Sequence, residues 1–219
     1  MNSTKAYSSK ELKFHSPFCA VIAGQSGSGK TSLLLKLVQQ YRDLIEPIPK
    51  SILYCYGQYN SAIPLLQKLG VSVSAGIPSE ETLKALPRPA LILLDDLMIQ
   101  LNSKREVLAD WFSRKSHHEN LSIVFIVQNL FERSMKIVRD NAQYMILLNS
   151  PSAALQIRSL GSQLFPGNLK YFLASYKQAV SDKKFGYLLI DLHPVSDSLL
   201  RLRTNLFKED DFQSVFIPN

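Results

Sequence analysis

A glycine-rich segment at residues 24–31, GQSGSGKT, constrains this chain more than any other feature. It matches the pattern G-x-x-x-x-G-K-[ST] at every fixed position. An apolar run typical of a strand, residues 18–23, precedes it, and apolar residues at helical spacing follow it over residues 34–41. Because the pattern stands between a strand and a helix, it predicts a loop that binds the phosphates of a nucleotide.

Each residue type in this loop suits that chemistry. Glycines let successive backbone N–H groups point at phosphate oxygens, and a helix beginning near Lys30 adds its positive N-terminal end. Lys30 would reach the β- and γ-phosphates, and the Thr31 hydroxyl would complete the coordination of Mg²⁺. We therefore expect ATP and Mg²⁺ as ligands. The expected nucleotide-binding residues are Gly24, Gln25, Ser26, Gly27, Ser28, Gly29, Lys30, Thr31 and Ser32.

Runs typical of strands alternate with helical spacing along the rest of the chain. Residues 90–94 and 122–127 are nearly continuous apolar runs, as central parallel strands covered on both faces are. The alternation predicts an α/β fold, a P-loop NTPase with a largely parallel central sheet flanked by helices on both faces. Further strands are expected at 51–56, 71–74, 144–148 and 185–192, and helices at 61–69, 79–86, 103–115 and 132–138.

One domain of this fold accounts for most of the 219 residues. We expect a flexible N-terminal arm at residues 1–17, the ATPase domain at 18–194, and a tail at 195–219 that packs on the same domain. The net charge of +7 fits a polyanionic partner and equally fits a solubilising surface.

Cys19 and Cys55 stand in apolar runs without metal-ligand spacing, so we expect reduced core residues. The pair His117 and His118 is expected at the surface. No apolar stretch approaches the roughly 20 residues that span a bilayer, and no signal peptide is evident, so we expect an intracellular, soluble chain without a membrane span.

Asp95 and Asp96 directly follow the apolar run at 90–94. In open parallel sheets, ligands bind outside the carboxyl ends of the strands. We expect Asp95 to hold Mg²⁺ through water and Asp96 to polarise the attacking water. Glutamate commonly fills that second role, and aspartate is one methylene shorter. Taken alone, such a pair is as often a helix cap or a loop charge.

Gln128 directly follows the run at 122–127. If that strand lies beside the Asp95 strand, Gln128 comes within reach of the γ-phosphate or the attacking water, where an amide can report hydrolysis. The alternative is that Gln128 or Asn129 caps the next helix. The strand at 51–56 falls between the two motifs, which favours the ATPase class with an inserted strand over nucleotide kinases and GTPases.

Arg114 and Lys115 precede the strand at 122–127, so they lie at the edge of the sheet opposite the nucleotide. They cannot serve their own subunit's ATP, but in a ring Arg114 could act on a neighbour's as a finger in trans. A solvated basic turn is the alternative. Arg133 and Arg139 follow Gln128 and are the other candidates for that role.

These residues resemble the FtsK-HerA superfamily of ring-forming, DNA-pumping ATPases. Within it, the chain is most similar to the poxvirus-type genome-packaging ATPases of large DNA viruses, virophages and Polinton (Maverick) elements. The phosphate loop is generic, whereas the segments at residues 127–131, 186–192 and 201–207, in that order, are specific to this branch. The matching segments are residues 24–31, 52–57, 91–97, 116–118, 127–131, 186–192 and 201–207. A glycine often stands just before the Ser-His-His segment, where this chain has Lys115.

The resemblance implies a RecA/FtsK-HerA-like fold of the ASCE division and a motor that drives double-stranded DNA into a capsid. It implies a homo-oligomeric ring that binds DNA without sequence preference, a capsid or portal-like partner, and Gln128 as a sensor. It places the protein in an infected or element-bearing host cell, in a cytoplasmic virus factory or the nucleus, or with the virion. Arg201 and Arg203 would contact DNA or a neighbouring subunit, or stand in a solvated tail.

Other functions stay open at this point. A helicase loader or replication initiator would share the phosphate loop, as would a nucleoside kinase. An assembly factor that binds ATP with little turnover is the non-enzymatic alternative. Stimulation of ATP turnover by DNA separates the motor from the kinase and the assembly factor.

Overall fold

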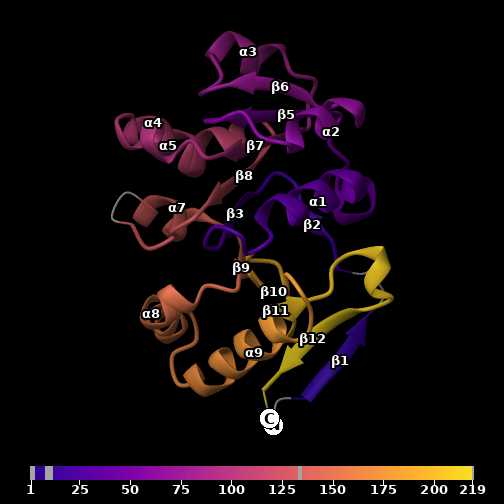
Figure 1. Ribbon diagram of the computed structural model, residues 1–219, viewed down its shortest axis with the longest axis vertical. Coiled ribbons are helices and arrows are strands. Elements are labelled where there is room, and N and C mark those ends of the chain that lie inside the picture. The colour runs from indigo at the N-terminus through magenta and orange to yellow at the C-terminus, as the bar shows by residue number, and fades with distance from the viewer. Residues whose placement is uncertain (1–2, 8–11, 133–134, 219) are drawn as a thin grey trace.

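Ten strands hydrogen-bond into one sheet in the computed structural model, which describes residues 3–7, 12–132 and 135–218. Across the sheet their order is β1-β12-β11-β10-β9-β3-β8-β7-β5-β6. Figure 1 shows the sheet running through the length of the molecule with helices on both sides. The strands are β1 (Ser3–Tyr7), β3 (Cys19–Ala23), β5 (Ser51–Tyr56), β6 (Ser72–Ala75), β7 (Ala90–Asp95), β8 (Leu121–Val127), β9 (Tyr144–Leu148), β10 (Tyr187–Asp191), β11 (Leu202–Thr204) and β12 (Gln213–Ile217). A separate parallel pair joins β2 (Phe14–His15) to β4 (Ile45–Glu46).

The sheet has a parallel part and an antiparallel part. From β9 across to β6 every pairing is parallel, and these strands carry the phosphate loop and the aspartates. β10, β11, β12 and β1 pair antiparallel and extend the sheet beyond β9. The expected α/β class with a largely parallel sheet is confirmed.

The strand that separates the two motif strands is β8. Strand β8 pairs with β3 on one side and with β7 on the other. Residues 51–56, which separate the motifs in sequence, instead form β5 on the outer side of β7. The expectation that residues 51–56 form the inserted strand was therefore wrong. The chain places β5 and β7 farther out in the sheet first, and β8 then occupies the position between β3 and β7.

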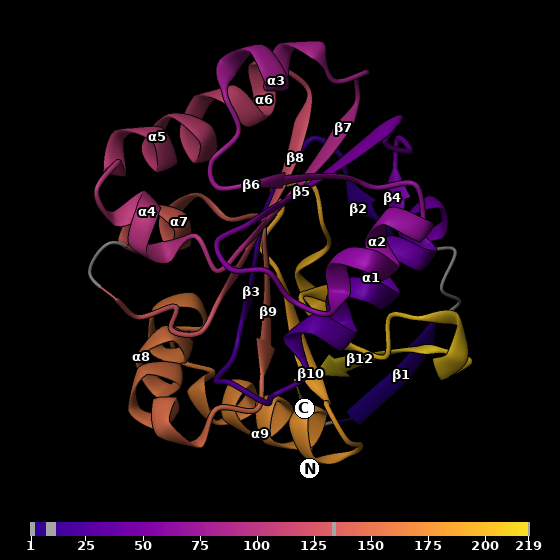
Figure 2. The ribbon, with the colours of Figure 1, turned by 45° about the horizontal axis from the view of Figure 1, so that its top comes forward.

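Helices cover both faces. The helices are α1 (Lys30–Leu44), α2 (Ala62–Lys68), α3 (Glu80–Ala85), α4 (Met98–Asn102), α5 (Arg105–Asp110), α6 (Ser116–His118), α7 (Lys136–Asn141), α8 (Ala154–Leu164) and α9 (Leu169–Ser181). Shorter turns are the π segment η1 (Trp111–Lys115) and the 3₁₀ segments η3 (Pro151–Ala153), η4 (Ser198–Leu200) and η5 (Lys208–Asp210). Figure 2 shows α1 and α2 on one side of the sheet, and α4, α5, α7 and α8 on the other.

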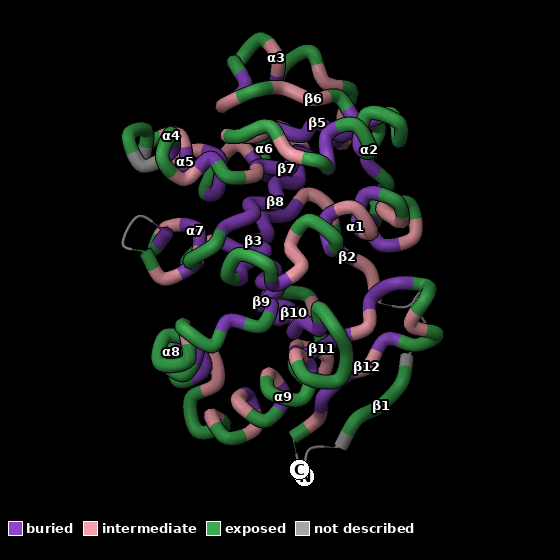
Figure 3. The backbone as a smooth tube through the Cα atoms, in the orientation of Figure 1, coloured by how far each residue is buried: buried purple, intermediate pink, exposed green. Residues whose placement is uncertain are grey.

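Alternate residues of each strand fill two separate cores. In β3, Val21 packs into the core shared with Phe112 and Phe172, whereas Ile22 packs into the core shared with Leu34 and Leu37. This follows from the two-residue period of a strand, which sends successive side chains to opposite faces. Figure 3 shows the buried residues concentrated along the central strands.

Local signals place some helix boundaries well and others less well. The Ser79 hydroxyl accepts a hydrogen bond from Thr82 N at 3.1 Å and caps α3, which lies within the helix expected at residues 79–86. The single helix expected at 103–115 is instead α5 followed by the π segment η1 and then α6. Trp111 and Phe112, neighbours in η1, are both buried.

Both cysteines lie in the core. Cys19 and Cys55 are free and buried, and burial raises the pKa of each thiol to about 12, so both are inert thiols at neutral pH. Among the residues the structure describes, no helix combines the length and apolar character that crossing a bilayer requires.

The N-terminal segment and the C-terminal tail meet at one edge of the sheet. Ser3–Tyr7 pairs antiparallel with Gln213–Ile217, so this part of residues 1–17 is an edge strand and differs from the flexible arm that the sequence suggests. The tail adds β11 and β12 to the same sheet. The pairing of β1 with β12 thus joins the N-terminal segment to the C-terminal tail within the antiparallel part of the sheet.

A buried ion pair stabilises this part of the sheet. Arg203 Nη2 donates to Asp191 Oδ2, and the two side chains are 2% and 4% exposed. Asp191 also accepts from His193 N and from the Ser196 hydroxyl. The expectation that Arg203 contacts DNA or a neighbouring subunit is therefore wrong, because its guanidinium is enclosed and neutralised within its own chain.

Removing one partner of this pair leaves an unpaired buried charge. We expect Arg203→Met to lower the free energy of unfolding by about 3–5 kcal/mol, measured by chemical denaturation. The double variant Asp191→Asn with Arg203→Met should regain part of that loss. Lys136→Ala, which breaks the exposed pair with Asp140, is the control and should cost about 1 kcal/mol or less. Equal losses in the single and double variants would contradict the pairing.

Candidate active site

The phosphate loop leaves the end of β3 and enters α1. Gly27 and Gly29 have φ angles of 78° and 103°, a region that side-chain-bearing residues rarely adopt. At Gly24 an added Cβ would lie 2.5 Å from the Ser28 hydroxyl and 2.9 Å from Leu148 Cβ. The glycines of the motif are thus required by the backbone path and by close packing.

Lys30 folds back onto its own loop. Its ammonium donates to the carbonyl oxygens of Gly24 at 2.6 Å and Gln25 at 3.0 Å. Partial burial lowers the pKa of Lys30, and the nearby charges of Asp95 and Asp96 oppose that shift. The ammonium is therefore held where its charge is weakly solvated, which strengthens its attraction for an anion.

The loop fits a phosphate group. The Ser28 hydroxyl is buried and has no hydrogen-bond partner among the described residues, so it is a donor without an acceptor. Side chains of Gln25, Ser26, Thr31 and Ser32 are exposed at the mouth of the loop. Backbone N–H groups, an unpaired hydroxyl and an ammonium together form the donor set that phosphate oxygens bind.

Asp95 ends β7 and is held by two residues that the sequence did not single out. Tyr54 donates its hydroxyl to Asp95 Oδ2 at 2.6 Å, and Asn60 Nδ2 donates to the Tyr54 hydroxyl at 2.9 Å. Burial raises the pKa of Asp95, while the bond from Tyr54 and the charge of Lys30 oppose that rise. The signal for Tyr54 was present in the sequence, since a tyrosine in a buried strand needs a partner for its hydroxyl.

Asp96 sits at a sharp turn of the backbone. Its φ angle is 54°, in the left-handed region that aspartate tolerates better than most residues. Gly57 packs directly against this turn, because a Cβ there would lie 1.9 Å from the Asp96 carbonyl oxygen. Gly57 N also donates to Asp95 O at 2.9 Å. The turn that exposes the Asp96 side chain thus depends on a glycine from β5's end.

One cavity of about 190 Å³ gathers the predicted chemistry. Its lining includes Lys30, Asp95, Asp96 and Gln128, which come from three different strands or loops. Glu132 also lines it, a residue that no motif identified. The pairing of β8 with β7 and β3 brings Gln128 to this place, as the sequence predicts if those strands are neighbours.

Neither Gln128 nor Asn129 caps the next described helix, α7, whose N-cap is Met135. Asn129 Oδ1 accepts from Phe131 N at 2.9 Å and closes the turn after β8. Gln128 is exposed toward the cavity that Lys30 and the aspartates line. The two polar residues after β8 thus have separate places.

The arginine candidates lie in different parts of the molecule. Arg114 is 72% exposed and pairs with Asp110 within the helical segment ahead of β8. Arg139 donates to the Leu130 carbonyl oxygen at 2.6 Å and stabilises the turn after Gln128. Arg133 lies outside the described residues. Neither described arginine lines the cavity that contains Lys30.

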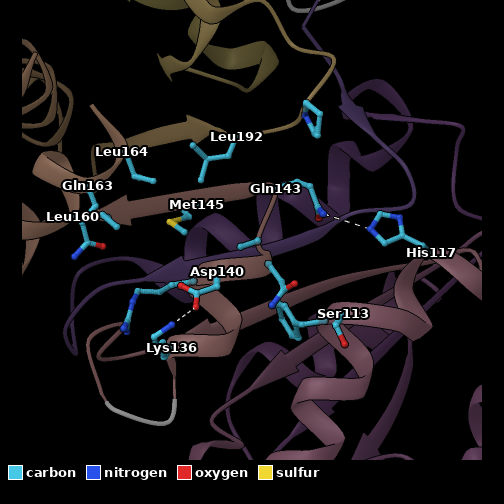
Figure 4. A pocket seen from close by; sticks show the side chains of 15 residues that line it. Ser113, His117, Lys136, Asp140, Gln143, Met145, Leu160, Gln163, Leu164 and Leu192 are labelled. Carbon is cyan, nitrogen blue, oxygen red and sulfur yellow. Dashed lines mark hydrogen bonds and ion pairs between the residues drawn. The ribbon is translucent and has the colours of Figure 1, made fainter. Parts of the chain in front are cut away.

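A larger cavity, of about 640 Å³, lies away from this chemistry. Figure 4 shows Lys136 paired with Asp140 and Gln143 pointing toward His117 around it. Gln143 immediately precedes β9, so this cavity opens at the edge of the parallel strands opposite the phosphate loop. In the described ranges no group of three or more His, Cys, Asp or Glu residues is placed to hold a metal ion.

A phosphate loop after β3, an acidic pair at the end of β7 and a strand inserted between β3 and β7 define a P-loop ATPase. The chain belongs to the family described as Poxvirus A32 protein, whose model matches residues 4–162. No curated protein matches the chain.

The chain is similar to several solved structures. The cytoplasmic domain of the Type VII secretion ATPase EccC from Thermomonospora curvata aligns with a TM-score of 0.51 and 15% identity, over 91% of this chain and 25% of that one. The flagellar accessory protein FlaH from Methanocaldococcus jannaschii aligns with a TM-score of 0.43 and 15% identity, over 60% and 71% of the two chains. KaiC-like protein PH0186 from Pyrococcus horikoshii OT3 aligns with a TM-score of 0.42 and 12% identity, over 66% and 81%. This chain therefore spans about a quarter of the EccC chain it matches, and the likeness is one of fold.

The Tyr54 hydroxyl should matter to catalysis because it orients the Asp95 carboxylate. We expect Tyr54→Phe to raise the Mg²⁺ concentration needed for half-maximal ATP hydrolysis by about tenfold, since loss of a group that orients a ligand typically weakens a metal site 10- to 100-fold. Tyr56→Phe removes a hydroxyl from the same strand, keeps the Tyr54–Asp95 bond, and should behave as wild type. An unchanged Mg²⁺ requirement in Tyr54→Phe would contradict this role.

Proposed function

We propose that this protein is an ATP-hydrolysing motor that moves double-stranded DNA into a capsid. The observation that supports this most is the convergence of Lys30, Asp95, Asp96 and Gln128 on one cavity in a chain of the poxvirus A32 family. Such a motor would work in an infected or element-bearing host cell, in a cytoplasmic virus factory or nucleus, or with the virion.

ATP binding begins with an exchange of partners at Lys30. The ammonium leaves the carbonyl oxygens of Gly24 and Gln25 and bonds to the β- and γ-phosphate oxygens. The Ser28 hydroxyl and the loop N–H groups gain acceptors that they lack within the chain. Binding is favourable because charged oxygens replace neutral carbonyls as the acceptors of an ammonium.

Thr31 and Asp95 are the residues that would hold Mg²⁺, Thr31 through its hydroxyl and Asp95 through water. The ion would neutralise charge on the phosphate oxygens during transfer. Tyr54 keeps the Asp95 carboxylate in one orientation, and Asn60 keeps the Tyr54 hydroxyl in place. Carboxylate, hydroxyl and water are the oxygen ligands that Mg²⁺ favours.

Asp96 is the general base for the attacking water. It accepts the water proton as the water oxygen bonds to the γ-phosphorus and the β–γ bridging oxygen leaves. Its exposed position in the turn after β7 faces the cavity that also holds Gln128. Gln128 positions the water or the γ-phosphate and changes its hydrogen-bond partner after hydrolysis, which couples the chemistry to β8.

Arg114 acts on the neighbouring subunit in a ring. It lies ahead of β8, at the edge opposite its own phosphate loop, and its side chain is largely exposed. In the assembly it would leave Asp110 and approach the γ-phosphate held by the next subunit. Rings of this kind surround the duplex and contact its phosphates through lysine and arginine, consistent with the net charge of +7.

Duplex DNA should stimulate ATP turnover. We expect hydrolysis by the wild-type protein to rise several-fold when long duplex DNA is added at low salt, and the stimulation to fall steeply with added salt because phosphate contacts release counterions. Lys30→Ala should hydrolyse no ATP with or without DNA. Turnover that DNA leaves unchanged would refute the motor and favour a kinase or an assembly factor.

A mixing experiment tests Arg114. Arg114→Ala keeps an intact phosphate loop but lacks the arginine, and Lys30→Ala keeps Arg114 but lacks the lysine of the loop. Neither variant should therefore hydrolyse ATP alone. Mixed at varying ratios, the two should regain a fraction of turnover wherever a Lys30→Ala subunit presents Arg114 to an intact neighbouring site. Absence of recovery at every ratio would show that Arg114 does not act in trans.

A further inference from the structure

A second cavity, about 260 Å³, lies on the other side of the phosphate loop. Gly29, Ser32 and Lys36 line it from the first turns of α1, and Phe185 and Lys184 line it from the turn between α9 and β10. The cavity with Asp95 and Asp96 borders the same loop through Lys30. The start of α1 therefore separates two cavities that together flank the phosphate loop.

The position of the two cavities sets the direction of a bound nucleotide. The Lys30 cavity lies toward β7 and β8, where the aspartates and Gln128 mark the place of the terminal phosphate. The second cavity lies toward β10 on the opposite side of β3. A nucleotide whose γ-phosphate faces the aspartates must extend its nucleoside away from them, past Gly29 and Ser32.

Phe185 is held beside the loop by its backbone and its neighbours. It has a φ angle of 63°, a conformation that carries a steric cost for a residue with a side chain. Gly186 after it admits no Cβ, which would lie 2.3 Å from the Ala179 carbonyl oxygen. A Cβ at Gly29 would lie 2.6 Å from Phe185 Cγ, so the Phe185 side chain packs directly against Gly29 of the phosphate loop.

The ring is nonetheless open to a ligand. Phe185 is 43% exposed. The ammonium of Lys184 lies 5.2 Å from the ring centroid. A strained, exposed aromatic ring next to a phosphate site, with a cation beside it, is suited to stack on a flat, electron-rich group.

We infer that Phe185 is the stacking platform for the base of the bound nucleotide and that this cavity holds the nucleoside. The inference rests on the nucleotide site of the proposed function and adds the residues that recognise the base. Every nucleobase has a face that can stack on an aromatic ring, so a platform of this kind accepts adenine and guanine alike. Lys184 adds attraction between its cation and the stacked rings.

Binding of nucleotides and of bare phosphates separates this inference from the phosphate loop itself. We would measure equilibrium binding of ADP, GDP and inorganic pyrophosphate to the full-length protein by calorimetry. Phe185→Ala should lower the affinity for ADP and GDP about tenfold, in the range of a lost base–aromatic stack. Its affinity for pyrophosphate should stay within about twofold of the wild-type value. Phe185→Leu, which keeps an apolar contact with Gly29, should also lose affinity for both nucleotides.

Two further variants serve as a positive and a matched control. Phe185→Trp should restore nucleotide binding, and its fluorescence should change with ADP and remain constant with pyrophosphate. Val195→Ala removes an exposed apolar side chain beyond the far end of β10 and should bind all three ligands as wild type does. Thermal unfolding of each variant establishes that it is folded.

The outcomes distinguish the two hypotheses. Lys30→Ala should lower the affinity for both ADP and pyrophosphate. Unchanged affinity for both ligands would overturn the phosphate-loop site on which the proposed function rests. If Lys30→Ala weakens both ligands while Phe185→Ala weakens neither, or weakens both equally, the nucleoside does not stack on Phe185. That result would overturn this inference and leave the proposed function intact.

Discussion

Three hydrogen-bonded parallel strands, β3, β8 and β7, determine where the chemistry of this protein takes place. Ala23 is paired with Val127, and Asp95 is paired with Ile126, so the three strands end at nearly the same level. Gly24, Gln128 and Asp96 are the residues that follow each of these ends. Because parallel strands present all their carboxyl ends at one edge, the phosphate loop, Gln128 and the acidic pair converge without any long-range adjustment of side chains.

The charged groups of the site have neutral hydrogen-bond partners within the chain. Lys30 is bonded to carbonyl oxygens of its own loop, and Asp95 is bonded to Tyr54, so each charged group already has a partner. A partner that is neutral is a weaker one than a phosphate or a cation. In the proposed mechanism Lys30 exchanges its two carbonyl acceptors for phosphate oxygens, while Tyr54 keeps its bond to Asp95. The geometry of the site is thus already formed, which limits the cost of reorganisation.

The parts of the site that follow from a local pattern could be predicted, and the parts that depend on tertiary packing could not. The phosphate loop, Asp95 and Gln128 each stand at a recognisable change from apolar run to polar residue. The place of β8 depends on how the chain crosses the sheet, which no local pattern records. Arginine is a residue type usually found at the surface, and only the packing of the C-terminal strands shows that Arg203 is buried and paired with Asp191.

The meeting of the parallel and antiparallel parts of the sheet accounts for the position of Phe185. Strand β10 runs antiparallel to β9, so its beginning, Tyr187, lies at the same edge as the end of β9 and the phosphate loop. The turn that enters β10 therefore passes beside Gly29 through Phe185, and Gly186 packs against the end of α9, where a Cβ would lie 2.3 Å from the Ala179 carbonyl oxygen. A parallel strand at this position would instead have brought its carboxyl end to the loop. The reversal of direction after β9 is thus what places an aromatic turn beside the phosphate loop, while the strands on the other side of β3 carry the acidic groups.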